Sequence, residues 1–237
     1  KTILAAHSIH IAAENYLEQE YPLVLWLVPS NTIRSQTYNA LRDPRHPYRQ
    51  TLDDTFNGKV RVFDVTQLEE IQPQDISQNV CIVIGTIQTF RVDKTEGRDV
   101  YNHKEALESH FNQVSTKTGL ECLENGKLKY SFANVLHLHR PLVLLDEAHN
   151  ARTKLTFEVL QRLSPTCIIE LTATPDNDKK TGSNVLYRVS AGELKDEEMI
   201  SIIASLEKKS EHPIAHAIIN YAKEKNLSIP EISNFSI

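Results

Sequence analysis

Short apolar runs alternate with polar, helix-like stretches along most of this chain of 237 residues. Each run is short for a helix and rich in Val, Leu and Ile, and the runs cover residues 21–28, 80–86, 141–145 and 167–169. Continuous apolar runs of this kind are typical of parallel strands buried on both faces. Residues 60–65 alternate and add a further short strand. This order of elements predicts an α/β fold with a mainly parallel sheet flanked by helices.

Helical periodicity fills the stretches between these strands. Residues 3–17, 33–41 and 153–163 repeat apolar side chains three or four positions apart, as an amphipathic helix does. Ser30, Asn31 and Thr32 stand just before the second of them, where each could serve as its N-cap. Residues 92–130 are polar, charged and weakly periodic. We expect them to form an insertion with one helix near residues 104–113 and a flexible remainder.

Two carboxylates, Asp146 and Glu147, end the apolar run at 141–145. In an open α/β sheet, ligands bind beyond the carboxyl ends of the strands, so these acids would stand at the edge of a site. An Asp there can hold Mg²⁺ against the phosphates of a nucleotide, and the adjacent Glu can orient or deprotonate a water molecule. The alternative is that the pair only caps the next helix.

Four motifs in a fixed order carry a resemblance to a known family. They are Asp146-Glu147-Ala148-His149, Leu171-Thr172-Ala173-Thr174-Pro175, Leu27-Val28-Pro29-Ser30 with Gln36, and Ile84-Gly85-Thr86-Ile87-Gln88-Thr89-Phe90. They resemble motifs II, III and Ia and a later strand-end motif of the DEAD/DEAH helicase superfamily. The amino-acid sequences of residues 86–90 and 184–187 most resemble the helicase (Res) subunit of type III restriction enzymes. The resemblance covers about residues 1–195 and implies the first RecA-like domain, a P-loop NTPase fold.

The resemblance implies an ATP hydrolase that uses Mg²⁺. Asp146 and Thr2 would bind the metal, and Lys1 would reach the phosphates. Glu147 would position the attacking water. Lys1-Thr2 resembles the end of the phosphate-binding loop G-x-x-x-x-G-K-[ST], so we expect the chain to be cut inside that motif. The glycine loop and the second RecA-like domain would then be missing, and we expect negligible ATPase activity from this chain alone.

The resemblance also implies contact with duplex DNA and a modification (methyltransferase) subunit as a further partner. His149, Thr172 and Thr174 would couple the state of the nucleotide to movement, although the two threonines would also suit a turn before Pro175. The residues that would contact nucleic acid are Ser30, Arg34, Gln36, Thr86 and Gln88. For Arg34 and Gln36, a solvated helix face is an equal alternative.

The sequence changes character near residue 196. Residues 202–215 resemble the nucleotide-binding domain of heavy-metal P-type ATPases, whose Ser-Glu-His-Pro box would place His212 against adenine. Periodicity alone predicts two amphipathic helices, at 196–208 and 213–225. Their apolar stripes would contain Met199, Ile202, Ile203, Leu206, Ile214, Ala217, Ile218 and Tyr221. We therefore predict a RecA-like domain over 1–195 and a helical appendage over 196–237. Two alternatives stay open: a fragment of a metal pump, and a non-catalytic chimeric fold.

Composition changes this picture little. The net charge of -5 and isoelectric point near 6.1 do not indicate a strongly basic surface. Three cysteines without metal-ligand spacing, and no run of about 20 apolar residues, predict a cytoplasmic protein without a membrane span. His137 and His139 would share a face, but two histidines without a third ligand favour packing or a surface position over a metal site.

Overall fold

A computed structural model describes residues 2–91, 98–116, 118–147, 153–175, 184–186, 197–206 and 213–229. The chain forms two compact units, Lys1–Asp176 and Asn177–Ile237. The domain boundary predicted near residue 195 falls outside the described residues and stays a prediction. No helix in the described ranges has both the length and the apolar character that a membrane crossing requires.

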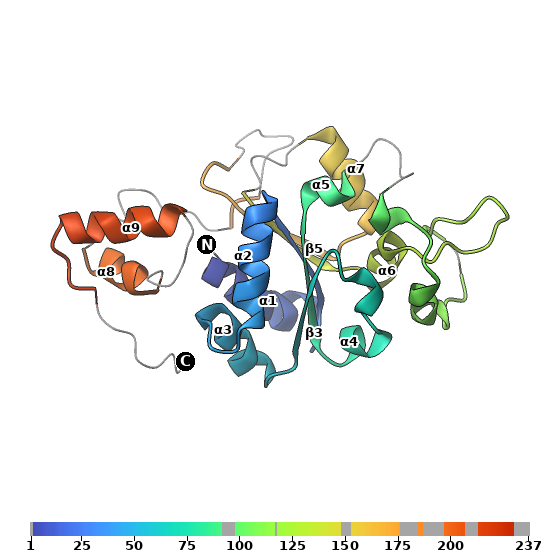
Figure 1. Ribbon diagram of the computed structural model, residues 1–237, viewed down its shortest axis with the longest axis horizontal. Helices are drawn as coiled ribbons and strands as arrows, with labels where there is room; N and C mark the ends of the chain where they lie inside the picture. Colours follow the sequence, from blue (N-terminus) through green and yellow to red (C-terminus); the bar gives the residue numbers. More distant parts are fainter. Residues whose placement is uncertain are drawn as a thin grey trace. The chain divides into compact units, whose positions relative to one another are not determined.

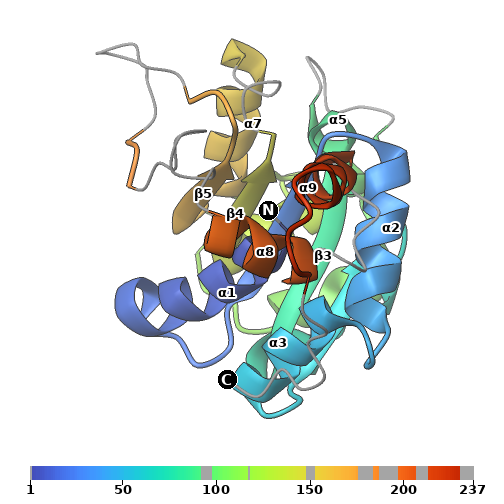
Figure 2. The same cartoon turned by 90° about the vertical axis from the view of Figure 1, so that its left-hand side faces the viewer.

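One five-stranded sheet forms the centre of the first unit. Its order is β2-β3-β1-β4-β5, and each neighbouring pair is parallel. The strands are β1 (Leu23–Val28), β2 (Val60–Asp64), β3 (Val80–Thr86), β4 (Leu142–Asp146) and β5 (Cys167–Leu171). The predicted strands and the α/β fold are therefore confirmed. Figure 2 looks onto the sheet, with β5 and β4 to the left and β3 to the right.

Helices cover both faces of this sheet (Figure 1). One face carries α1 (Thr2–Ala12), α2 (Asn31–Arg42) and α3 (Pro47–Phe56). The other carries α4 (Pro73–Ser77), α5 (Ile87–Phe90), α6 (Phe132–His139) and α7 (Lys154–Leu163). Every residue of β1 and β3 is buried between the two layers. This explains why these strands are apolar along their whole length rather than at alternate positions.

The predicted helices form close to their predicted bounds. The Ser30 hydroxyl accepts a hydrogen bond from the backbone N–H of Ile33 at 3.3 Å, so this serine is the N-cap of α2. Helix α1 continues as a π-helical turn over Ala13–Leu17. Helix α3 was not predicted, although Pro47 at its first turn is a usual start signal.

Part of the insertion at 92–130 packs onto the main core. The predicted helix is present as a 3₁₀ helix, Glu105–Phe111, and a second 3₁₀ turn covers Asp99–Tyr101. Tyr101 and Leu107 are fully buried in the cluster that also holds β1 and β3 side chains. Tyr101 and Leu107 are thus part of the packed core, while the flexibility expected for the remainder of the insertion stays a prediction.

Asn134 on α6 connects the later part of the insertion, around Glu121 and Lys129, to the core through hydrogen bonds. Its side chain is 2% exposed. The amide nitrogen donates to the carbonyl oxygens of Glu121 (2.9 Å) and Lys129 (2.7 Å), and Oδ1 accepts from the N–H of Glu121 (3.0 Å). One buried amide therefore satisfies three backbone groups of a segment that has little regular structure of its own.

The second unit contains the two predicted helices, α8 (Glu197–Leu206) and α9 (Pro213–Glu224). Their buried contact is made by Ile200, Ala204 and Ala222, with Ile218 and Ile219 packed against it. The predicted stripes were partly wrong, because Ile202, Ile214 and Tyr221 are exposed by 51%, 40% and 37%. Two of the three buried contact residues are alanines, which a pattern of large apolar residues does not reveal.

Candidate active site at the carboxyl edge of the sheet

The strand ends bring most of the predicted site residues to one edge of the sheet. Val28 of β1 is level with Thr86 of β3, Leu27 of β1 with Leu145 of β4, and Asp146 of β4 with Leu171 of β5. Adjacent strands lie about 4.8 Å apart. The ends of β3, β1, β4 and β5 therefore fall within about 15 Å of one another. All five strands end here because the sheet is entirely parallel.

Asp146 and Glu147 form a fixed pair at the centre of this edge. The N–H of Glu147 donates to Oδ1 of Asp146 at 3.0 Å and lies 2.9 Å from the carbonyl oxygen of Leu171. Asp146 is 7% exposed, whereas Glu147 is partly exposed. The structure thus holds one carboxylate in a set orientation and leaves the next one within reach of solvent.

Glu147 also has an unusual backbone conformation. Its φ of 51° lies in the left-handed region, which residues other than glycine seldom adopt. Such strain is often found at functional sites. The alternative role as a helix cap is not supported for α7, the next described helix, because Thr153 caps it by accepting from the N–H of Thr156 at 3.3 Å.

Thr172 and Thr174 follow β5 beside this pair. Asp146 is level with Leu171, the last residue of β5, so Thr172 comes directly after the strand end next to the pair. The Thr172 hydroxyl accepts a hydrogen bond from the N–H of Thr174 at 3.2 Å. This bond forms the turn before Pro175 that the sequence allowed as an alternative. It does not conflict with a coupling role for these threonines, which stays a prediction.

The predicted nucleic-acid residues differ in accessibility. Ser30, Gln36 and Gln88 are exposed, and Ser30 also caps α2. Thr86 is only 6% exposed, and its hydroxyl lies 3.1 Å from that of Thr89 in the first turn of α5. Thr86 therefore stabilises the strand-end turn, while the other three present polar groups at the surface.

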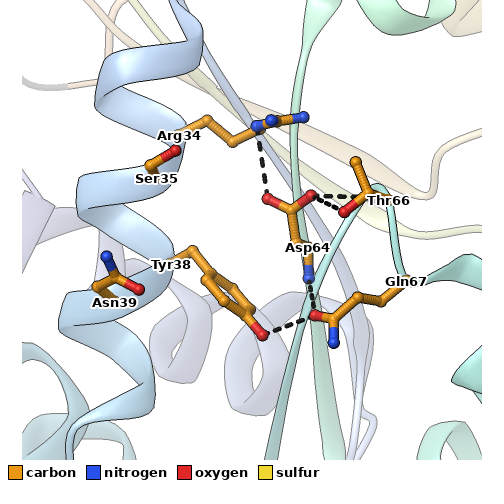
Figure 3. Close-up of a pocket in the computed structure, with 7 residues that line it drawn as sticks. All are labelled: Arg34, Ser35, Tyr38, Asn39, Asp64, Thr66 and Gln67. Carbon is orange, nitrogen blue, oxygen red and sulfur yellow. Dashed lines mark hydrogen bonds and ion pairs between the residues drawn. The ribbon is translucent and has the colours of Figure 1, made fainter.

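Arg34 lies in a polar network that the sequence did not predict (Figure 3). Its Nε is 3.4 Å from Oδ2 of Asp64, and its side chain is 19% exposed. The fully solvated helix face is therefore the wrong interpretation for Arg34, although it fits Gln36. Asp64 ends β2, and its Oδ1 accepts from the N–H (2.9 Å) and hydroxyl (2.7 Å) of Thr66.

An open pocket of about 500 Å³ adjoins this network. It lies between α2 and the end of β2, and its lining residues are Arg34, Ser35, Tyr38, Asn39, Asp64, Thr66 and Gln67. Sequence reasoning missed all of these except Arg34. The available signal was the acidic residue that ends the alternating strand at 60–64, just as Asp146 ends its own strand.

Several predicted residues lie outside the described ranges, namely Lys1, His149 and His212. Thr2 begins α1 and is partly exposed. In the described part of the chain, no group of three or more His, Cys, Asp or Glu side chains could hold a metal ion. A magnesium site does not need such a group, because Mg²⁺ is usually held by one or two carboxylates together with phosphate oxygens and water. The oxygen ligands of Asp146 and Thr2 fit that chemistry.

The two histidines of α6 pack against the fold. His137 Nδ1 lies 2.9 Å from the carbonyl oxygen of Arg162. His139 meets His110 edge to face, with ring centroids 6.2 Å apart. Burial lowers the pKa of both His110 and His139, and the neighbouring His110 lowers that of His139 further. The packing interpretation of these residues is thus supported by their contacts.

A short part of the chain is similar to copper-exporting P-type ATPases. The proteins of Staphylococcus aureus strains bovine RF122 / ET3-1, MRSA252 and JH9 are each 50% identical to it over 40 residues, which is 17% of this chain. The chain spans about 5% of the length of these curated relatives. This similarity agrees with the resemblance stated for the end of the sequence, and it is minor in extent.

A far longer match covers the unit that carries the site. The family described as type III restriction enzyme, res subunit, matches residues 1–177. These residues include all five strands and every predicted site residue except His212. The match confirms the RecA-like α/β fold and supports a helicase-superfamily ATPase motor, a class that uses nucleotide and Mg²⁺. The chain therefore belongs to the family of type III restriction enzyme res subunits.

Proposed function

We propose that this chain is the motor part of a type III restriction-type enzyme, which hydrolyses ATP to translocate along duplex DNA. A modification (methyltransferase) subunit is its proposed protein partner. The proposed localisation of the chain is the cytoplasm. One observation carries the proposal beyond family membership. The Asp146-Glu147 pair ends β4, flanked by β1 and β5, at the edge where an α/β sheet binds its ligand.

In this proposal, Asp146 binds the magnesium ion of Mg·ATP. When bound, Mg²⁺ neutralises charge that develops on the phosphates. The hydrogen bond from the N–H of Glu147 fixes the carboxylate before the ligand arrives, so little orientational freedom is lost on binding. Thr2 offers its hydroxyl as a second oxygen ligand, and Lys1 offers its ammonium group to the phosphates.

Glu147 acts on the attacking water. Its carboxylate orients the molecule and accepts a proton as the water oxygen bonds to the γ-phosphorus and the bond to the bridging oxygen breaks. His149, Thr172 and Thr174 respond to the loss of the γ-phosphate. The proposed DNA contacts near the same edge of the sheet are made by Ser30, Arg34, Gln36, Thr86 and Gln88.

Calorimetric titration with Mg·ATP tests the proposal. Asp146→Asn removes the charge of the metal ligand at constant shape, and we expect it to weaken binding by about tenfold or more. Asp54→Asn makes the same change on the exposed surface of α3 and should leave binding unchanged. Glu147→Gln should bind Mg·ATP but abolish any hydrolysis that DNA stimulates.

Three results would contradict this assignment. Equal binding by wild type and Asp146→Asn would exclude Asp146 as the metal ligand. Loss of binding in His212→Ala alone would favour a fragment of a pump nucleotide-binding domain, which the 40-residue similarity makes a specific rival. No binding by wild type would favour a non-catalytic fold.

A further inference from the structure

The pocket between α2 and β2 is separate from the proposed nucleotide site. In the sheet, β2 and β4 are separated by β3 and β1. Three strand spacings place the end of β2 about 14 Å from Asp146 along the same edge. The pocket volume of about 500 Å³ is within the range of small-molecule sites. Both ends of this edge could therefore hold a ligand at the same time.

The charges in the pocket wall largely cancel. Arg34 is paired with Asp64, and Asp64 also accepts two hydrogen bonds from Thr66. Among the described residues, no other charged side chain lines the pocket. A site built for phosphate would keep its arginine free of a carboxylate partner, since the carboxylate repels the anion. The neutral balance favours an uncharged polar ligand.

The pocket offers hydrogen-bonding groups that no described neighbour uses. The Nε of Arg34 is buried and makes its ion pair without hydrogen-bond geometry. The two Nη atoms of Arg34 make no hydrogen bond to a described residue. The exposed amide of Asn39 likewise has no partner in the described part of the chain. The wall thus presents donors from Arg34 and both a donor and an acceptor from Asn39.

An aromatic side chain, Tyr38, also lines the pocket and is held in place. The Tyr38 hydroxyl donates to Oε1 of Gln67 at 2.6 Å and accepts from Nη1 of Arg42 at 2.9 Å. Gln67 Oε1 also accepts from the N–H of Asp64 at 3.1 Å. Figure 3 shows Tyr38 and Arg34 directed from α2 toward the end of β2. The ring is therefore positioned before any ligand binds.

We infer that this pocket binds one unpaired base of a DNA strand, a contact that rests on the proposed function of the chain on DNA. A base is uncharged, flat and edged with both donors and acceptors, which suits the neutral wall, the Tyr38 ring and the amide of Asn39. Arginine and amide side chains are the groups that most often recognise base edges. The exposed Gln36 on the same helix lies on the proposed DNA surface, so a strand there could deliver a base to the pocket.

Two DNA duplexes that differ by a single base test this inference. One carries a one-nucleotide bulge, and the other carries an abasic bulge with the same backbone. Fluorescence anisotropy measures the affinity of the full chain for each. We expect the wild type to bind the base-containing bulge about tenfold more tightly, the size of effect usual for one base–aromatic contact.

Variants locate the base in the pocket. Asn39→Ala removes the free amide, and Ser35→Tyr fills the pocket from an exposed position on α2. Both should reduce the tenfold preference to less than about twofold. Gln50→Ala truncates an exposed amide on α3 and should keep the full preference. Thermal melting of each variant checks that the fold is unchanged.

Each other outcome overturns the inference. Equal affinity of wild type for both bulges would show that no base is bound, while leaving the proposed motor function in place. A tenfold preference that survives Ser35→Tyr would place the base elsewhere. Failure of wild type to bind any duplex would remove both this contact and the DNA part of the proposed function, whereas Mg·ATP binding would still test the ATPase part.

Discussion

Glycine and alanine at position 147 separate the cost of the backbone conformation from the role of the carboxylate. Both changes remove the Glu147 side chain and every contact it makes. Both keep the backbone N–H that donates to Asp146. They differ in the Cβ atom, which is unfavourable at a φ of 51°. The glycine variant should therefore be the more stable of the two, although glycine normally destabilises a fold.

The expected difference follows from two opposing effects. The left-handed conformation costs an L-residue about 1–2 kcal/mol. Glycine also lowers the free energy of unfolding by roughly 0.4–1 kcal/mol, because the unfolded chain of the glycine variant has more conformational freedom. The net advantage of glycine over alanine is then about 0.5–1 kcal/mol. With an m value of about 2 kcal/mol/M for urea, this shifts the unfolding midpoint by roughly 0.3–0.5 M.

Urea unfolding followed by tryptophan fluorescence measures this shift. Trp26, the single tryptophan, is 1% exposed in β1 and reports on the unit that carries the site. Glu158 on α7 is the matched control, since glycine should be less stable than alanine in a right-handed helix by about 1 kcal/mol. An alanine variant as stable as the glycine variant at position 147 would refute the argument from backbone strain. If DNA stimulates hydrolysis by the wild type and both variants retain it, the role of the carboxylate is refuted.

Three further predictions concern the framework around the site. Asn134→Ala should lower the free energy of unfolding by about 2–4 kcal/mol in urea titrations, because three backbone groups lose a buried partner. Ser30→Ala should cost about 1 kcal/mol in the same assay while Ser30→Asp should not, because aspartate also caps helices. Burial lowers the pKa of His110 and His139 below 6.5 in the folded protein. As the pH drops, these histidines therefore bind protons in the unfolded chain before they do so in the folded one. The free energy of unfolding should accordingly fall as the pH drops below about 6.5. His139→Phe should weaken this pH dependence, and an unchanged dependence would exclude His139 as its source.

The sequence predicted the sheet well because its signals are local. Every strand is an apolar or alternating run, and each starts and ends close to its predicted bounds. The signals were weaker where packing decides the conformation. The 3₁₀ helix Glu105–Phe111 and the buried Tyr101 depend on distant residues of the core, which no local pattern shows.

The candidate site was predicted only where it follows motifs. Asp146 and Glu147 are adjacent in sequence, and a strand with two carboxylates at its end is recognisable without a structure. The left-handed backbone of Glu147 is not recognisable, because glutamate gives no sign of it. The Arg34–Asp64 ion pair joins α2 to the end of β2, so it could not be found before the fold placed these elements side by side.

The strand order has a consequence for how the chain folds. β1 is synthesised before both of its neighbours, yet Leu23 pairs with Cys81 and Val24 pairs with Leu142. The Leu-Val-Leu-Trp-Leu-Val segment therefore has no strand partner until β3 has emerged, and its second partner, β4, follows only near the end of the first unit. Pairings this distant in sequence slow folding, and an unpaired apolar strand is prone to aggregate. Folding yield in the cell should accordingly depend on how well β1 is protected during synthesis, more than on the final stability of the sheet.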